Sequence, residues 1–330
     1  MTLTVPGFDR VRLPGADGVE LFAAVGGNGG GSPVVLLHGF PQTHLMWRHA
    51  AVRLAERHTV VCPDLRGYGA SDKPVATGPE VYSKRAMAAD VVALAAALGH
   101  ERFALVGHDR GALVAFRAAL DHPETITHLG VLDVVPTLDT WDVLRGVRAA
   151  VGYHLYLMAQ PPGLPETMIA NSADVFFGSF LDAWAGDPAA MPPDVRAEYL
   201  RASAAAVPSI VADYRASAGI DVTHDRADLD AGSQLAMPVT VLQQDWGSQL
   251  GYDAAGGLAG VGTGPGAPAD RRGALHGRGG ARRGRGGDPR PAAPLSPAAA
   301  CGAAAGGREG GRDGSAGEAG GGGPRIDRPR

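Results

Sequence analysis

Short apolar runs alternate with longer helical patterns along the first 136 residues of the chain. The runs have the length of buried strands and lie at residues 33–37, 58–62, 103–106 and 129–133. Segments with helical character separate them, at residues 47–54, 82–98 and 112–120. Because strands that alternate with helices build βαβ units, this order predicts an α/β fold, a mostly parallel sheet with helices on both faces.

Further patterns precede and follow this alternation. Residues 11–13 and 20–25 surround a Gly/Asp turn and predict an N-terminal hairpin. The chain then turns mostly helical until residues 238–242, which again have a strand pattern. A helical cap inserted between two strands of one sheet is therefore predicted. The predicted divisions are residues 1–136 for the first part of the core, 137–232 for the cap, 233–254 for the return strand of the core and 255–330 for a tail.

The composition of the tail differs from that of the rest of the chain. Gly, Ala, Arg and Pro dominate from Gly256 onward, and no aromatic residue follows Tyr252. Such a segment cannot bury enough apolar surface to offset the entropy lost when it is ordered. We expect a disordered, low-complexity tail.

Charge and composition narrow the classes of partner. The formal net charge of −4 gives no case for binding nucleic acid or an anionic membrane surface. Cys62 and Cys301 form neither a disulfide pattern nor a metal-binding spacing. The first residues lack the pattern of a signal peptide, and no apolar run is long enough to cross a bilayer. We expect a cytoplasmic protein that acts on a small molecule, without a nucleic-acid or membrane partner.

The most informative chemistry lies in residues 107–111, Gly-His-Asp-Arg-Gly, between a predicted strand and a predicted helix. Small residues on both sides of an acidic residue at such a junction are typical of a nucleophile elbow, a sharp turn with a strained backbone. A carboxylate raised on that turn attacks carbon and forms an ester, which water later breaks. Asp109 is therefore the candidate nucleophile. The alternative is an ordinary connection in which Asp109 is the N-cap of the helix.

Besides the elbow, eight further segments carry motifs that can be compared with those of known families. They lie at residues 37–43, 64–69, 84–88, 120–123, 131–133, 153–154, 159–161 and 213–216. Together they make the chain resemble the α/β-hydrolase superfamily, and within it the fluoroacetate and haloacetate dehalogenases, over roughly residues 7–250. The pair Asp109-Arg110 is the most specific element, because haloalkane dehalogenases and epoxide hydrolases of this fold more often carry Trp after the nucleophile. The resemblance implies an α/β-hydrolase fold and no metal or organic cofactor.

The resemblance also implies roles for residues at the elbow. Asp109 would displace halide from the α-carbon of a small 2-halo acid. The backbone N–H groups of Phe40 and Arg110 would form the oxyanion hole for hydrolysis of the ester. The guanidinium of Arg110, which is always charged, would bind the substrate carboxylate.

Further roles follow for residues after the elbow. Asp133, at the end of its strand, would orient a catalytic histidine, and Asp245 after the next strand is the competing acid. His154 and Tyr214 in the cap would donate hydrogen bonds to the leaving halide. The oligomeric state is open, with a homodimer as one alternative.

The chain departs from the pattern of this family in three places. Leu113 stands where the family has a second carboxylate-binding Arg, and Leu155 stands where it has a halide-binding Trp. These departures leave a larger or more apolar substrate as an alternative. The family places the base histidine in a Gly-His-Phe segment after the last strand. Here the sole histidine after His224 is His276, and no strand pattern precedes it.

The favoured function is cleavage of the carbon–halogen bond of a small 2-halo carboxylic acid through an aspartyl ester. One alternative is an epoxide hydrolase of the same fold, with Tyr153, Tyr156 or Tyr214 as its acids. The other is a hydrolase-like protein that forms the ester and does not release it, because the base histidine is missing.

The genetic code offers an explanation for the missing histidine. Residues 273–281 can be encoded so that a shift of one base gives Gly-His-Phe-Met-Ala-Glu-Glu-Ala. Residues 257–265 can be encoded so that the same shift gives Ala-Trp-Arg-Ala-Trp-Ala-Pro-Asp. Both products look like the missing family segments. Our hypothesis is that the chain is out of frame from about Ala255. Resequencing the gene tests it, and an intact frame with no single-base slip nearby would refute it.

Overall fold

The computed structural model describes residues 3–27, 30–185 and 190–243, all of which lie in the first of two units of the chain, Met1–Arg272. The predicted tail, Asp245 and His276 lie outside the described residues. The strands are β1 (Asp9–Pro14), β2 (Glu20–Gly26), β3 (Val34–Leu37), β4 (Val60–Pro63), β5 (Phe103–His108), β6 (Ile126–Leu132) and β7 (Val239–Leu242).

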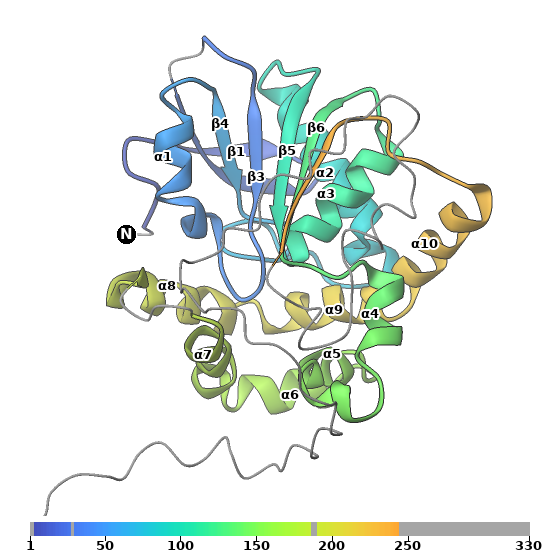
Figure 1. The fold of residues 1–330 in the computed structure, drawn as a ribbon. Coiled ribbons are helices and arrows are strands. Elements are labelled where there is room, and N and C mark those ends of the chain that lie inside the picture. The colour runs from blue at the N-terminus through green and yellow to red at the C-terminus, as the bar shows by residue number, and fades with distance from the viewer. Residues whose placement is uncertain (1–2, 28–29, 186–189, 244–330) are drawn as a thin grey trace, which may run out of the picture. The chain divides into compact units, whose positions relative to one another are not determined.

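Within the described residues these seven strands form one sheet in the order β1-β2-β4-β3-β5-β6-β7 (Figure 1). β1 and β2 form the predicted antiparallel hairpin, and β2 also pairs antiparallel with β4. All other neighbours in this sheet are parallel. The predicted mostly parallel sheet is therefore confirmed.

The two faces of β3 contact different helices, which explains why its apolar run is continuous. Val34 and Leu36 pack in one cluster with Ala51 of α1 (Ala50–Leu54). Val35 and Leu37 pack in another cluster, together with residues of α2 (Lys84–Ala97) and α3 (Arg110–Asp121). Because successive residues of a strand point to opposite faces, helices cover both sides of the sheet, as predicted.

Local signals set both ends of α2. The Ser83 hydroxyl accepts a hydrogen bond from the backbone N–H of Ala86 at 3.1 Å, as an N-cap does. After the last turn, Gly99 has a φ of 79°, a left-handed conformation that glycine adopts without strain. A 3₁₀ helix, η2 (Pro79–Tyr82), directly precedes the N-cap residue Ser83. The predicted helix at residues 82–98 is confirmed with slightly different ends.

The predicted helix at residues 47–54 is wrong in its first half. A 3₁₀ helix, η1 (His44–Trp47), comes first, and α1 begins only at Ala50. Thr43 is the N-cap of η1: its side chain accepts a hydrogen bond from the backbone N–H of Leu45 at 3.4 Å, and a helical turn starts there. Trp47 is then buried against the face of the sheet that α1 covers.

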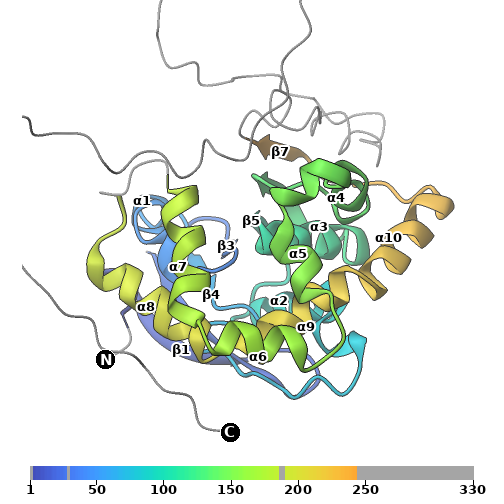
Figure 2. The ribbon, with the colours of Figure 1, turned by 90° about the horizontal axis from the view of Figure 1, so that it is seen from below.

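Between β6 and β7 the described residues form helices and loops without a strand. The helices are α4 (Thr137–Val143), η3 (Gly146–Ala150), α5 (Tyr153–Met158), α6 (Leu164–Ala170), α7 (Ala173–Trp184), α8 (Pro193–Ala204), α9 (Val207–Ser217) and α10 (Ile220–Ala231). Figures 1 and 2 show α5 to α9 gathered at the end of the sheet where the parallel strands finish. The predicted divisions after residues 136, 232 and 254 stay a prediction.

Side chains of these helices hold the loops that follow β3 and β4. Ser203 Oγ donates to the carbonyl of Pro41 at 3.0 Å, and Ser209 Oγ donates to the carbonyl of Gly67 at 2.6 Å. The helical segment is thus bonded to the edge of the sheet that carries the predicted chemistry. None of the described helices is long and apolar enough to span a membrane.

A buried arginine joins α3 to α10. The guanidinium of Arg117 contacts the carboxylates of Asp121, Asp225 and Asp228 at 3.0, 2.6 and 2.5 Å. Burial lowers the pKa of Arg117, but the three carboxylates outweigh burial and the pKa rises. The cation therefore holds together three anions that would otherwise repel one another.

We predict that Arg117→Met lowers the free energy of unfolding by about 3 kcal/mol, because it leaves the carboxylates close together without their cation. Urea denaturation followed by circular dichroism measures the change. The matched control is Arg201→Met, since the side chain of Arg201 is 60% exposed in its ion pair with Glu198. That control should lose no more than about 0.5 kcal/mol. Equal losses in the two variants would contradict the assignment.

Candidate active site

The predicted site residues lie where the parallel strands end. Phe40 follows β3, Asp109 follows β5 and Asp133 follows β6. They line one cavity of about 780 Å³ together with Arg110 of α3. The helices of the inserted segment close its other side, and from them come His154, Tyr214 and Leu155. The structure thus places the described residues predicted for the nucleophile, the oxyanion hole, substrate binding and support of the histidine around a single cavity, at the edge of a parallel sheet where ligands bind.

Asp109 stands on a strained turn between β5 and α3. Its φ is 49° and its ψ is −119°, a conformation that side-chain-bearing residues rarely adopt. Glycines make the turn possible. A Cβ at Gly107 would lie 2.2 Å from the carbonyl oxygen of Gly111, and a Cβ at Gly111 would lie 2.4 Å from that of His38. Neither glycine can be replaced without moving backbone, so the spacing in the sequence reflects close packing.

Asp109 occupies the N-cap position of α3, as the alternative interpretation expected, but its carboxylate makes no hydrogen bond to the helix. Asp109 Oδ1 instead accepts a hydrogen bond from the backbone N–H of Phe40 at 2.7 Å. The approach is close because a Cβ at Gly39 would lie only 2.5 Å from the Cβ of Asp109. The N–H group predicted for the oxyanion hole therefore points at the predicted nucleophile.

Arg110 is buried and bonded to Asp213 of α9. Its Nε donates to Asp213 Oδ2 at 2.9 Å, and its Nη2 donates to Oδ1 at 2.7 Å and to Ser217 Oγ at 2.7 Å. The guanidinium also lies 4.1 Å from the centre of the Tyr214 ring. Burial lowers the pKa of Arg110, but Asp213 outweighs it and the pKa is raised. These contacts within the described residues use Nε and Nη2.

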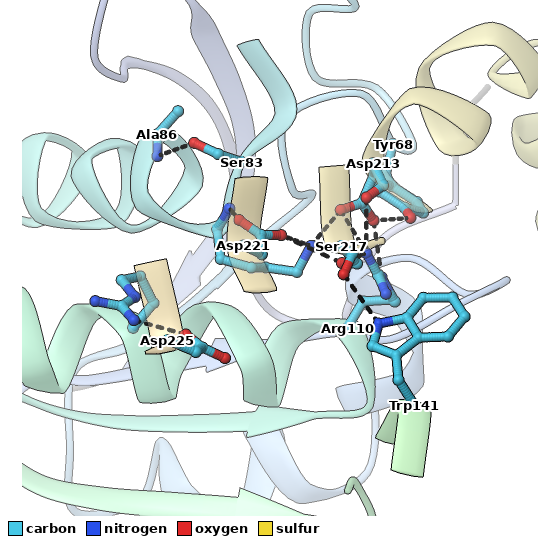
Figure 3. A network of polar contacts seen from close by, with 11 residues as sticks. Tyr68, Ser83, Ala86, Arg110, Trp141, Asp213, Ser217, Asp221 and Asp225 are labelled. Atoms are coloured by element: carbon cyan, nitrogen blue, oxygen red, sulfur yellow. Dashed lines mark hydrogen bonds and ion pairs between the residues drawn. The ribbon is translucent and has the colours of Figure 1, made fainter. Parts of the chain in front are cut away.

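Asp213 is the centre of a buried polar network (Figure 3). Besides Arg110, it accepts hydrogen bonds from Tyr68 Oη at 2.6 Å and from Lys84 Nζ. Asp221 joins through its contact with Lys84 Nζ at 3.7 Å. Burial raises the pKa of Asp213, but the two cations outweigh burial and hold it well below its usual range. Sequence reasoning missed this network, although its members lie in or beside the segments that carry the resemblance.

An aromatic cluster surrounds His154 and Tyr214. The ring of Phe40 stacks on His154 at 5.9 Å and contacts Tyr214 edge-on at 5.3 Å. Phe180 and Trp184 complete the cluster. His154 is 6% exposed and its Nδ1 has no hydrogen-bond partner among the described residues. Burial, assisted by the charge of Arg110, lowers the pKa of His154 to about 3, so the imidazole is neutral.

Tyr214 keeps its proton for a similar reason. Burial and the neighbouring carboxylate of Asp109 raise the pKa of Tyr214 well above its ordinary value, and Arg110 only partly opposes them. The phenol therefore remains a hydrogen-bond donor at every moderate pH. Two neutral donors thus line the cavity beside the carboxylate of Asp109.

Asp133 has a φ of 48° and also stands just past a strand end. Its backbone N–H donates to the carbonyl of Leu242 at 2.8 Å, which fixes it beside the end of β7. The histidine that it is predicted to orient, and the competing acid Asp245, are not among the described residues. Of the described residues that line the cavity, two are histidines, His108 and His154.

Comparison with known proteins matches the chain to the α/β hydrolase fold family over residues 32–216. Fluoroacetate dehalogenase from Burkholderia sp. is 41% identical over 239 residues, which are 71% of this chain and 77% of that protein. Soluble epoxide hydrolase from Corynebacterium sp. (strain C12) is 38% identical over 154 residues, which are 46% of this chain and 52% of that protein.

A solved structure extends the likeness to three dimensions. ALR0039 from Nostoc sp. PCC 7120 superposes with a TM-score of 0.74 at 37% identity, covering 78% of this chain and 88% of that chain. The predicted fold and the predicted superfamily are both confirmed. The chain therefore belongs to the α/β hydrolase family, as an enzyme with fluoroacetate dehalogenase and epoxide hydrolase homologues.

Proposed function

We propose that this enzyme cleaves the carbon–halogen bond of a small 2-halo carboxylic acid, of the haloacetate type, through an ester on Asp109. The observation that carries the proposal is the carboxylate raised on the elbow, in a cavity, with the N–H of Phe40 2.7 Å from its oxygen. A carboxylate oxygen attacks the α-carbon, and the carbon–halogen bond breaks with its electron pair leaving on the halide. The relation to fluoroacetate dehalogenase supports the same reading.

The second step is hydrolysis of that ester. Water adds to the ester carbonyl carbon of Asp109, and the negative charge that develops on the carbonyl oxygen is stabilised by the N–H groups of Phe40 and Arg110. The acyl carbon–oxygen bond then breaks, which frees the 2-hydroxy acid and regenerates the carboxylate. A histidine, supported by Asp133 or Asp245, would take the proton from water and deliver it to the oxygen that leaves as the hydroxyl of the 2-hydroxy acid. We hold to the hypothesis that a shifted reading frame has removed this histidine from the chain.

Arg110 and the cap supply binding in this proposal. Since Nε and Nη2 of Arg110 are bonded to the network around Asp213, we assign Nη1 to the substrate carboxylate. His154 and Tyr214 donate to the departing halide. Both side chains are buried and neutral. They can therefore donate hydrogen bonds to a developing anion, whereas a cation in their place would also form an ion pair with Asp109.

Epoxide hydrolysis is the second candidate, and one observation favours it. Among the three candidate tyrosine acids, Tyr214 lines the cavity beside Asp109. Tyr156 donates its hydroxyl to the carbonyl of Leu144 at 2.8 Å, and Tyr153 is 47% exposed. A phenol at Tyr214 could protonate the opening epoxide oxygen. Release of halide from a 2-halo acid, compared with formation of a diol from an epoxide, separates the two candidates.

Incubation with bromoacetate should place a carboxymethyl ester on Asp109, detected by peptide mass spectrometry. Asp109→Asn should remain unmodified, because an amide is a far weaker nucleophile. Asp182→Asn is the matched control: its side chain is 67% exposed and should leave the ester at Asp109 unchanged. An unmodified Asp109 in the wild-type protein would refute the dehalogenase proposal. Steady halide release would refute the alternative of a protein without turnover, whereas a lasting ester would support it.

His154 should make the stability of the protein depend on pH. The pKa of His154 is about 3 in the folded state and about 6.5 in the unfolded state, so the unfolded chain alone binds a proton as the pH falls. Between pH 7 and pH 5 this linkage should cost about 2 kcal/mol of unfolding free energy. His154→Phe keeps the aromatic packing and should lose about 2 kcal/mol less over that interval. Parallel stability curves for both proteins, measured by urea titration, would contradict a neutral buried His154.

A further inference from the structure

The cavity is much larger than a haloacetate. Fluoroacetate has five non-hydrogen atoms, and at the ~30 Å³ that a water occupies in the liquid these need on the order of 150 Å³. The described residues around Asp109 line an open cavity of about 780 Å³. The space beside Asp109 therefore has room for a substrate with more atoms than a carboxylate, a halogen and the carbon between them.

Apolar side chains occupy the wall next to Arg110. Leu113 lies one helical turn after Arg110 on α3, so both face the cavity from the same side of the helix. Leu155 follows His154 on α5 and lines the cavity as well. A Cβ at Gly152 would lie 2.6 Å from Leu144 Cδ1 and 3.2 Å from Leu155 Cδ1, so both leucines pack closely against Gly152.

Trp141 continues this wall and is tied to the same network as Arg110. Its indole Nε1 donates to the carbonyl of Ser217 at 3.2 Å, while Arg110 Nη2 donates to Ser217 Oγ at 2.7 Å (Figure 3). The indole N–H is therefore used in a bond to the backbone, and the ring presents its carbon atoms to the cavity that it lines. A carboxylate held at Arg110 would have this apolar wall beside it.

Charge alone is a weak source of affinity in this cavity. Apart from its two histidines, the acidic and basic side chains among the described residues that line it are those of Asp109, Arg110 and Asp133. Asp213, bonded to Arg110, offsets the single positive charge. A bound carboxylate therefore gains little from net charge, and contact with the apolar wall has to supply the rest. Each methylene buried there should raise binding about fourfold.

We propose that the substrate is a 2-halo carboxylic acid with an apolar substituent of several carbons on the reacting carbon. In this assignment, which rests on the proposed function, Arg110 binds the carboxylate and Leu113 and Leu155 contact the substituent. These two leucines determine specificity, and they take no part in the bond changes at Asp109.

The test measures the rate of ester formation on Asp109 with 2-bromopropanoate, 2-bromobutanoate and 2-bromohexanoate. The reacting carbon is secondary in all three acids, so the intrinsic reactivity is nearly constant and the chain length alone varies. The rate should rise with length, by at least tenfold from propanoate to hexanoate. Because ester formation is read by mass spectrometry in a single turnover, the test does not depend on the base histidine.

Two variants assign the preference to the wall. Leu155→Trp fills the space and Leu113→Arg replaces an apolar contact with a charge. Each should abolish the advantage of 2-bromohexanoate while 2-bromopropanoate still modifies Asp109, which also shows that the variant is folded. Leu164→Trp is the matched control, because Leu164 is 59% exposed on α6 and does not line the cavity. It should keep the wild-type order of rates.

The outcomes separate this inference from the function on which it rests. If no 2-bromo acid, bromoacetate included, modifies Asp109, the proposed function fails. If the wild-type protein reacts with 2-bromopropanoate at least as fast as with 2-bromohexanoate, the inference alone is overturned. If Leu155→Trp and Leu113→Arg both keep the preference for hexanoate, the assignment of the two leucines is overturned.

Discussion

The arrangement of the site depends on one buried carboxylate, that of Asp213. It is 0% exposed, and such a charge is tolerated only when cations and hydrogen bonds compensate it. Its donors Tyr68, Lys84 and Arg110 precede β6 in the chain, whereas Asp213 itself belongs to α9, one of the helices between β6 and β7. The same interaction therefore fixes α9 against the sheet edge and sets the plane of the Arg110 guanidinium. Tyr214, the next residue of α9, is positioned with it.

A second constraint acts on the nucleophile itself. The backbone of Asp109 is held in a conformation that costs of order 1–3 kcal/mol, which the surrounding contacts must offset. The close packing of Gly39, Gly107 and Gly111 provides that support, and the N–H of Phe40 binds the carboxylate that the turn exposes. Strain and hydrogen bonding thus act on the same residue, and they hold its oxygen at the edge of the cavity.

The sequence was sufficient for the sheet and for the elbow because both are local. The run at β3 predicts a buried strand, and the glycines around Asp109 predict the turn. The network around Asp213 is not local, since 103 residues separate Asp213 from Arg110 and 145 separate it from Tyr68. The spacing of apolar residues along the chain does not predict a contact between residues so far apart in the sequence. The helix predicted from residue 47 begins later, at Ala50, and a separate 3₁₀ helix with Thr43 as its N-cap takes up residues 44–47.

The pairing of Arg110 with Asp213 also has a consequence for reactivity. A carboxylate bound by a free cation is a poorer nucleophile, because its lone pairs are engaged and its charge is neutralised. Arg110 is the one permanently charged cation among the described residues that line the cavity, and its charge is already matched by Asp213. His154 is kept neutral by burial, so it adds no second cation. The polar network thus holds a guanidinium next to Asp109 while leaving the negative charge of the nucleophile available for attack.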